Sequence, residues 1–343
     1  MHPTRTLALL FSLLSLTALA GETEALAAYN AHNYARALSE WQPLANAGNA
    51  RAQFGMGKLY EAGQGVTQDY ATAASWMRKA ATQGDADAQN TLGRYYLQGH
   101  GVAQDAAQAA SWFQRAAKQD NPSAQNNLAS LYLEGHGVTQ DLARAAALYK
   151  QSAEQGYAIA QNNLGLLYMR GQGVARDPKT AAGWFEKSAM QGNADGEFYA
   201  GMVYYHGTGV KKSNIDGVGW YHKAAEQGHV AAQTALAMAI LKGDAGDAYT
   251  QPEAIHLLHK AAEAGYMQAQ HNLAIYYANG EGDDHDVGQA YFWIEVAAKN
   301  GDTQGDKLRE ALTAQLPAEK LQAARSSVTV WMAAHPAAAP AVQ

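Results

Sequence analysis

Histidines are the residues of this chain with the clearest capacity for chemistry, and two pairs of them invite a metal-binding interpretation. His256 and His259 are three residues apart, so a helix would place both side chains on one face. A zinc site needs three or four ligands about 2 Å from the ion, and no third ligand is evident near this pair. His100 and His136 hold equivalent loop positions, which predicts a separation of roughly 10 Å, too far for one ion. We therefore predict a solvated helix face at the first pair and no metal or cofactor.

The other candidates for chemistry are carboxylates and nucleophiles. The segment from Glu281 to Asp286 could offer oxygen ligands to calcium, but it lacks the spacing of a calcium loop, so we interpret it as an exposed acidic turn. The chain has no cysteine, which excludes a thiol nucleophile, a disulfide framework, a cysteine metal site and a lipid-anchored N-terminal cysteine. No nucleophile elbow, phosphate loop or zinc-protease motif occurs. We therefore predict that the protein is not an enzyme and has no catalytic residue.

The N-terminus carries the features of an export signal. Arg5 precedes an apolar run over residues 7–16, and Ala18-Leu19-Ala20 resembles a cleavage site. The run is shorter than the roughly 20 residues that a bilayer span needs, and no later segment is long and apolar enough. We predict that residues 1–20 are a signal peptide and that the protein is periplasmic, with secretion as the alternative. The net charge of −6 argues against nucleic-acid binding, which requires Lys and Arg to neutralise phosphates.

The elements that would position any functional residue come from a 36-residue repeat. Two of its clearest copies are Leu92-Gly93-x-x-Tyr96-x-x-Gly99-x-Gly101-Val102-x-x-Asp105 and Leu164-Gly165-x-x-Tyr168-x-x-Gly171-x-Gly173-Val174-x-x-Asp177. Small and large apolar residues three and four apart predict a first helix, the Gly-x-Gly pair ends it, and the aspartate begins a second helix. In that second helix, Trp or Leu recurs between alanines and is expected to be a core residue. Such a period is typical of a solenoid.

These motifs resemble the Sel-one-like repeat, a branch of the tetratricopeptide-like helical repeats. The pattern A-x-A-x-x-x-L-G-x-x-Y-x-x-G-x-G-V-x-x-D-x-x-x-A-x-x-W is met nearly in full by residues 50–84, 86–119 and 158–192. The resemblance implies an all-α fold, an α/α superhelical solenoid of two-helix repeats. The sixth repeat departs from the pattern, because it has lost the Gly-x-Gly-Val loop. The predicted organisation is a capping half-repeat at 21–48, seven repeats over 49–301 (49–84, 85–120, 121–156, 157–192, 193–228, 229–265 and 266–301), capping helices at 302–332 and a disordered tail at 333–343.

The resemblance also implies where a partner would bind, because first helices line the concave surface of tetratricopeptide-like solenoids. The lining positions are five and two residues before, and two and five residues after, the Leu of Leu-Gly. They are polar in the N-terminal repeats and apolar further along, which favours a groove for a protein or peptide. The alternative is that these side chains pack against the neighbouring repeat. The candidate partner-binding residues are Asn90, Arg94, Asn126, Asn162, Leu166, Met169, Phe198, Met202, Tyr205, Met238, Leu241 and Ile275.

The resemblance favours one class of function and leaves two others open. Members of this family commonly act as scaffolds, so we expect an exported adaptor that binds a protein or peptide partner of unknown identity. Cysteine-rich relatives are linked to β-lactam binding or hydrolysis, but they depend on disulfides that this chain does not have. A glycan-binding module using aromatic residues such as Phe198 and Tyr205 is the third possibility.

Overall fold

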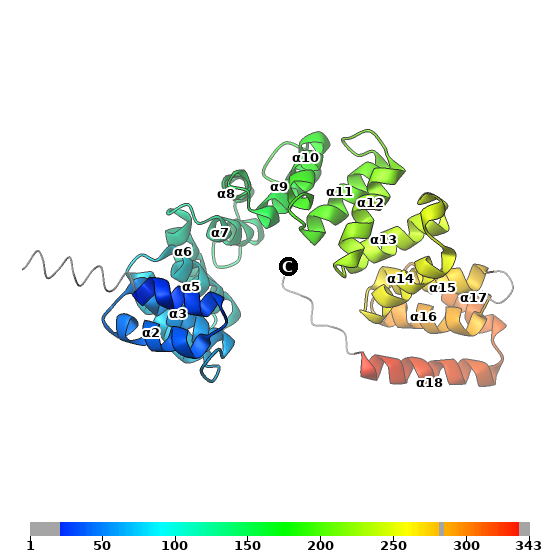
Figure 1. The fold of residues 1–343 in the computed structure, drawn as a ribbon. Helices are drawn as coiled ribbons and strands as arrows, with labels where there is room; N and C mark the ends of the chain where they lie inside the picture. The colour runs from blue at the N-terminus through cyan, green and yellow to red at the C-terminus, as the bar shows by residue number, and fades with distance from the viewer. Residues whose placement is uncertain (1–20, 281–284, 336–343) are drawn as a thin grey trace, which may run out of the picture. The chain divides into compact units, whose positions relative to one another are not determined.

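The protein is represented by a computed structural model that describes residues 21–280 and 285–335 (Figure 1). All regular elements in this part of the chain are helices, so the predicted all-α class is confirmed. The predicted signal peptide, residues 281–284 of the acidic loop and residues 336–343 of the predicted tail lie outside the described residues. The chain divides into two compact units, one ending at Arg176 and the other beginning at Asp177.

The first unit is a series of antiparallel helices, each of which packs on the next one in the chain. A helical segment at residues 21–30 precedes α2, so the N-terminal cap contains two helices where the sequence predicts half of a repeat. Ala25 and Ala28 of this segment are buried against Trp41. The elements are α2 (Tyr34–Asn46), α3 (Ala50–Ala62), α4 (Tyr70–Thr82), α5 (Ala86–Gln98), α6 (Ala106–Ala117), α7 (Pro122–Glu134), α8 (Leu142–Glu154) and α9 (Ala158–Arg170).

The second unit continues the same alternation and ends in two further helices. The short 3-10 helix Gly246–Ala248 lies in the sixth repeat. The final helix continues to Ala334, two residues beyond the predicted end of the C-terminal cap. The α-helices are α10 (Pro178–Ala189), α11 (Ala194–His206), α12 (Asn214–Glu226), α13 (Val230–Leu241), α14 (Gln251–Glu263), α15 (Met267–Asn279), α16 (Val287–Lys299), α17 (Asp306–Gln315) and α18 (Ala318–Ala334).

The ends of the helices follow the capping residues of the repeat. Asp105 accepts a hydrogen bond from the Gln108 amide and so caps α6, and Asn121 caps α7 in the same way through the Ala124 amide. The first glycine of each regular loop ends the first helix in the left-handed conformation, as Gly99 does with φ of 74°. The predicted helix–loop–helix unit is therefore built as its sequence indicates.

The second glycine of the loop holds neighbouring repeats together. Gly101 has φ of 67°, and a Cβ atom added to it would lie 2.0 Å from the Tyr70 carbonyl oxygen at the start of α4. Gly173 has the same relation to the Leu142 carbonyl oxygen at the start of α8, also at 2.0 Å. Only a residue without a Cβ atom allows the loop to lie this close to the preceding repeat.

The tryptophans of the second helices differ from the prediction that all of them are core residues. Trp112 and Trp293 are buried, but Trp76, Trp184 and Trp220 are only half-buried. A Lys or Arg three residues further along the helix lies over the ring in four repeats, with cation-to-centroid distances of 3.9 Å at Trp76, 4.3 Å at Trp112, 4.0 Å at Trp184 and 4.0 Å at Trp220. The outer face of each of these indoles is therefore covered by a cation, which interacts favourably with the ring.

A column of buried glutamines connects the helices within and between repeats. Gln89 of α5 is 5% exposed and donates to the Ala81 carbonyl oxygen at 3.0 Å, and its own oxygen accepts from Gln119 at 2.8 Å. The donation to the residue eight positions earlier recurs at Gln53, Gln125, Gln161, Gln233 and Gln270. Because a buried amide without partners is costly, this pairing stabilises the stack. The sequence repeats these glutamines visibly, but only the structure shows their role.

The fifth repeat has Glu197 in place of this glutamine. Glu197 is 4% exposed and accepts from Gln227 at 2.7 Å. Burial raises the pKa of its carboxyl group, and the hydrogen bond from Gln227 offsets only part of that effect. The glutamines of the other repeats donate to the carbonyl eight positions earlier, which here is that of Ala189, and an ionised carboxylate cannot make this donation.

Glu197→Gln should therefore stabilise the protein by about 1 kcal/mol at pH 7, the value of one net hydrogen bond. A carboxyl group whose pKa is raised by folding costs stability above its folded pKa, and that cost disappears below its unfolded pKa, near 4.5. The gain should consequently fade as the pH falls toward 4. Urea unfolding at pH 7 and pH 4 measures it, with Gln125→Glu as the matched reverse change, expected to destabilise at pH 7. An equal gain at both pH values would contradict the account.

The sixth repeat replaces its missing glycine loop with polar side-chain contacts. Asp244 accepts hydrogen bonds from the Tyr205 hydroxyl and, at 2.6 Å, from Asn214 at the start of α12. Asn214 is the register equivalent of Tyr70, against which Gly101 packs. A carboxylate therefore makes the inter-repeat connection where the backbone does not.

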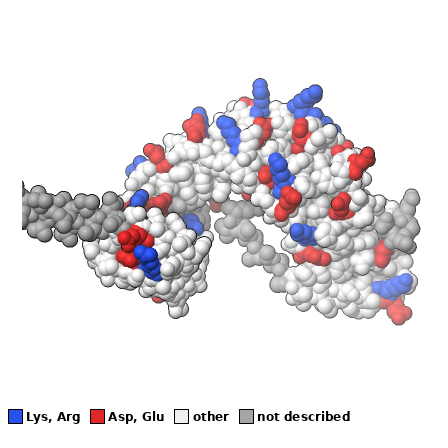
Figure 2. Space-filling view, viewed as in Figure 1, with Lys and Arg blue, Asp and Glu red and all other residues white. Residues whose placement is uncertain are grey.

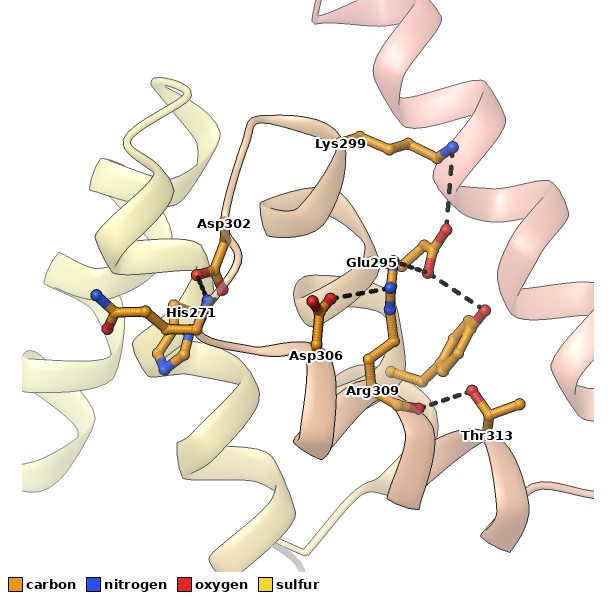
Figure 3. A network of polar contacts seen from close by, with 9 residues as sticks. His271, Glu295, Lys299, Asp302, Asp306, Arg309 and Thr313 are labelled. Carbon is orange, nitrogen blue, oxygen red and sulfur yellow. Dashed lines mark hydrogen bonds and ion pairs between the residues drawn. The ribbon is translucent and has the colours of Figure 1, made fainter.

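The C-terminal cap is fastened by a polar network between α15, α16 and α17 (Figure 3). His271 lies 2.6 Å from Asp302, and both side chains are largely buried. Glu295 of α16 lies 3.9 Å from both Lys299 and Arg309, and Arg309 also pairs with Asp306 at 2.9 Å. Hydrogen bonds from His271 and the following backbone lower the pKa of Asp302 despite the opposing effect of burial.

Candidate functional site

The predicted partner-binding residues lie on the first helices of the repeats: α3, α5, α7 and α9 in the first unit and α11, α13 and α15 in the second. Equivalent residues form columns, because each first helix repeats the same register. On the face shown in Figure 2, acidic and basic side chains are interspersed over both units without a large patch of one sign. Charge alone therefore does not single out a binding surface, and the predicted residues are distinguished by how far neighbouring side chains cover them.

In the N-terminal repeats of the first unit, the residues of these columns are polar and contact neighbouring side chains. Arg94 pairs with Glu61 of the preceding repeat at 3.4 Å, with both side chains partly exposed. Lys58 lies 5.0 Å above the Tyr29 ring. The Ser130 and Tyr149 hydroxyls are 2.7 Å apart. This surface can exchange its exposed ion pair for contacts with a polar partner, because such pairs contribute little stability.

The positions of the three predicted asparagines favour the alternative interpretation, in which these side chains pack against the neighbouring repeat. Asn126 and Asn162 are 6% and 5% exposed. The oxygen of Asn90 accepts from Asn127 at 3.0 Å, and that of Asn126 accepts from Asn163 at 3.0 Å, in each case from the next repeat. These amides therefore connect repeats, and the side chain of Asn90 is the most accessible of the three.

The end of the first unit presents apolar side chains. Leu166 and Met169 of α9 are half-buried. Ile159 lies about two turns before Leu166 on the same face of the helix and is 45% exposed. The change from charged to apolar residues along the columns is thus already present at the surface of α9.

In the second unit, four predicted residues pack against the hydrophobic core: Phe198, Met202, Tyr205 and Leu241. Phe198 stacks on the His229 ring at 4.8 Å between centroids. His229 caps α13 by accepting from the Ala232 amide and lies 3.1 Å from Asp195, whose pKa this hydrogen bond lowers. Aromatic packing within the protein therefore occupies the rings on which the glycan-binding alternative depends.

Met238 and Ile275 differ from those four residues. Ile275 is 39% exposed, and Met238 is half-buried without belonging to the set packed against the core. They hold the same column position on α13 and α15, two residues after Leu236 and Leu273. Among the predicted partner-binding residues of this unit, the structure thus leaves two outside the set packed against the core, and they lie on adjacent first helices.

The histidine pair of the sixth repeat is divided between surface and interior. His256 is exposed, whereas His259 is half-buried with its Nε2 atom 2.9 Å from the Tyr277 hydroxyl. Burial lowers the pKa of His259 and so favours its neutral form. Within residues 21–280 and 285–335, no group of three or more His, Asp or Glu side chains is arranged to hold a metal ion. No helix there is long and apolar enough to cross a membrane.

Two-helix repeats that share a register and carry a variable row of residues on their first helices define a helical-repeat solenoid. The Sel1 repeat family matches residues 50–85, 86–121, 122–157, 158–193, 194–229, 230–266 and 268–302. The chain therefore belongs to the Sel1 repeat family, as the sequence motifs predict. Sel1 repeats are protein-interaction modules, and proteins of this fold are generally non-catalytic scaffolds.

Two solved structures are similar over most of the chain. The protein c5321, a protective antigen present in uropathogenic Escherichia coli strains, is 33% identical with a TM-score of 0.71, and the match covers 94% of this chain and 71% of that chain. A Sel1 repeat protein from Oxalobacter formigenes is 28% identical with a TM-score of 0.65, covering 70% of this chain and 96% of that chain. No curated protein matches the sequence.

Proposed function

We propose that this protein is an exported, non-enzymatic adaptor that binds a protein partner on the first helices of its repeats. The observation that carries the proposal is the apolar pair of half-buried Met238 and exposed Ile275, in register on adjacent first helices of a family of interaction modules. Methionine suits such a surface because its flexible side chain adapts to different partners. The N-terminal sequence supports export into the periplasm, with secretion as the alternative.

The first helices of the first unit offer a separate, polar surface that would give specificity to an interaction of their own. Arg94 and Glu61 form an exposed ion pair that a partner can replace with its own charges. The apolar residues of α13 and α15 would then supply binding energy through burial. A protein segment of mixed charge fits the surface of the first unit, and an apolar segment fits the surface of α13 and α15.

Site-specific photocrosslinking tests the proposal in cells. A photoreactive amino acid at Ile275 should crosslink to a specific protein, which mass spectrometry can identify. The same amino acid at Ile215, which is 84% exposed on α12, is the matched control and should not capture that protein. Crosslinks from Ile275 only to glycan, or the same products from both positions, would refute the proposal. Hydrolysis of a chromogenic β-lactam by the purified protein would refute its non-enzymatic part.

A further inference from the structure

The second helices carry a recurring place for an indole ring. In five of the seven repeats a tryptophan holds this place, and in four of them a cation three residues later lies 3.9 to 4.3 Å from the ring centroid. The ring points toward the preceding repeat, as Trp112 does in packing with Met77 and Leu92. The place therefore has an apolar floor and a cationic cover.

The sixth repeat keeps the cation but has lost the indole. Leu257 stands at the tryptophan position of α14, and Lys260 stands at the cation position. The third repeat also has leucine there, Leu148, but Gln151 replaces the cation. Among the seven repeats, the sixth alone combines a missing indole with a cation in this position.

A cavity of about 450 Å³ opens where the indole would lie. Leu257, Leu236 and Ala225 supply its apolar surface, and Lys260 stands at its edge. Tyr249, from the loop that is altered in this repeat, provides an aromatic wall beside His222, with 5.7 Å between ring centroids. The volume lies within the range of ligand pockets.

Three side chains with a full charge line the cavity: Glu226, Glu253 and Lys260. Glu226 lies 3.3 Å from His222, and Glu253 accepts from the backbone and hydroxyl of Thr250. The Lys260 side chain forms no hydrogen bond or ion pair with any described residue. His256 lies one turn before Lys260 on the same face of the helix. The Lys260 side chain is thus available to an acidic group of a ligand, whereas both glutamates have partners within the protein.

We propose that this cavity binds an aromatic side chain, followed by an acidic residue, from a protein partner. The incoming ring takes the place that tryptophan holds in five other repeats, with Leu257 beneath it and Lys260 over it. The acidic residue pairs with Lys260. The site lies on the second helices and is additional to the surface proposed for the first helices.

The test uses the full chain and a dipeptide probe, Ac-Trp-Asp-NH2, with Ac-Leu-Asp-NH2 for comparison. Isothermal titration or saturation-transfer NMR should show binding of the tryptophan probe with a Kd below about 1 mM, and binding of the leucine probe at least about tenfold weaker. Leu257→Trp restores the tryptophan of the repeat and should fill the cavity, so binding should weaken at least about tenfold. Leu148→Trp makes the same change in the third repeat and should leave probe affinity unchanged.

Lys260→Gln provides a second variant that does not alter the volume of the cavity greatly. It copies the third repeat and should weaken binding of the tryptophan probe several-fold, since a cation over a ring contributes modestly. Failure of the wild-type protein to bind the probe at 10 mM would overturn the proposal. Equal affinity of wild type and Leu257→Trp, or of wild type and Lys260→Gln, would overturn it as well.

Discussion

Gly101→Ala should lower the free energy of unfolding by about 3 to 5 kcal/mol, a large effect for a single methyl group. The backbone at this glycine has φ of 67°, which by itself costs an alanine about 1 kcal/mol. The added Cβ atom would also lie 2.0 Å from the Tyr70 carbonyl oxygen, so α4 and the loop must move apart. Urea unfolding followed by circular dichroism measures the loss.

Gly84→Ala is the matched control for this substitution. Gly84 has φ of 99°, but no atom lies within 4 Å of the position that a Cβ atom would take. It should therefore cost only about 1 kcal/mol, through the backbone alone. The difference between the two variants isolates the close approach of neighbouring repeats. Equal losses would show that the stack tolerates a wider spacing than the structure indicates.

Asp302→Ala should destabilise the C-terminal end of the second unit by about 2 to 4 kcal/mol at pH 7. The carboxylate is buried, lies 2.6 Å from His271 and accepts from the Gln304 amide at 2.9 Å, so its removal leaves buried donors without partners. Asp306→Ala is the control from the same network, because its pair with Arg309 is exposed and should contribute less than about 1 kcal/mol.

The pH dependence of this effect follows from the lowered pKa of Asp302. A carboxyl group with a depressed folded pKa stabilises the protein above its unfolded pKa of 3.8, and the contribution is lost as the pH falls through the folded pKa. The penalty of Asp302→Ala should therefore be full at pH 7 and shrink below pH 4. A constant penalty from pH 7 to pH 3 would contradict this role of the ionised carboxylate.

The fold was predictable because its signals are local and repeated. Gly-x-Gly, a capping aspartate and helical spacing of apolar residues specify each unit, and their recurrence specifies the stack. The buried glutamines recur just as regularly, but a polar residue in a helix carries no sequence signal for burial. Their role depends on a carbonyl group at the end of the preceding helix, which only the packing shows.

The binding surface was predictable only as a set of positions. Spacing along a helix places Met202 and Met238 in the same column, but it does not show which neighbouring side chains cover them. The structure packs Met202 against the core and leaves Met238 outside that set. The prediction that all tryptophans are core residues failed for the same reason. The cation that covers each half-buried ring comes from the next turn of the same helix and not from the core. Exposure depends on tertiary packing, whereas register depends on the sequence alone.

The most direct measurement for the proposed function is the affinity of the full chain for the protein captured from Ile275, compared with the Met238→Glu, Ile275→Glu double variant. Placing two carboxylates on this apolar pair should weaken binding at least about 100-fold, because each would be desolvated at the interface. Ile215→Glu, on the exposed side of α12, should bind like wild type. Equal affinities of wild type and the double variant, with both proteins folded by circular dichroism, would contradict binding on the first helices.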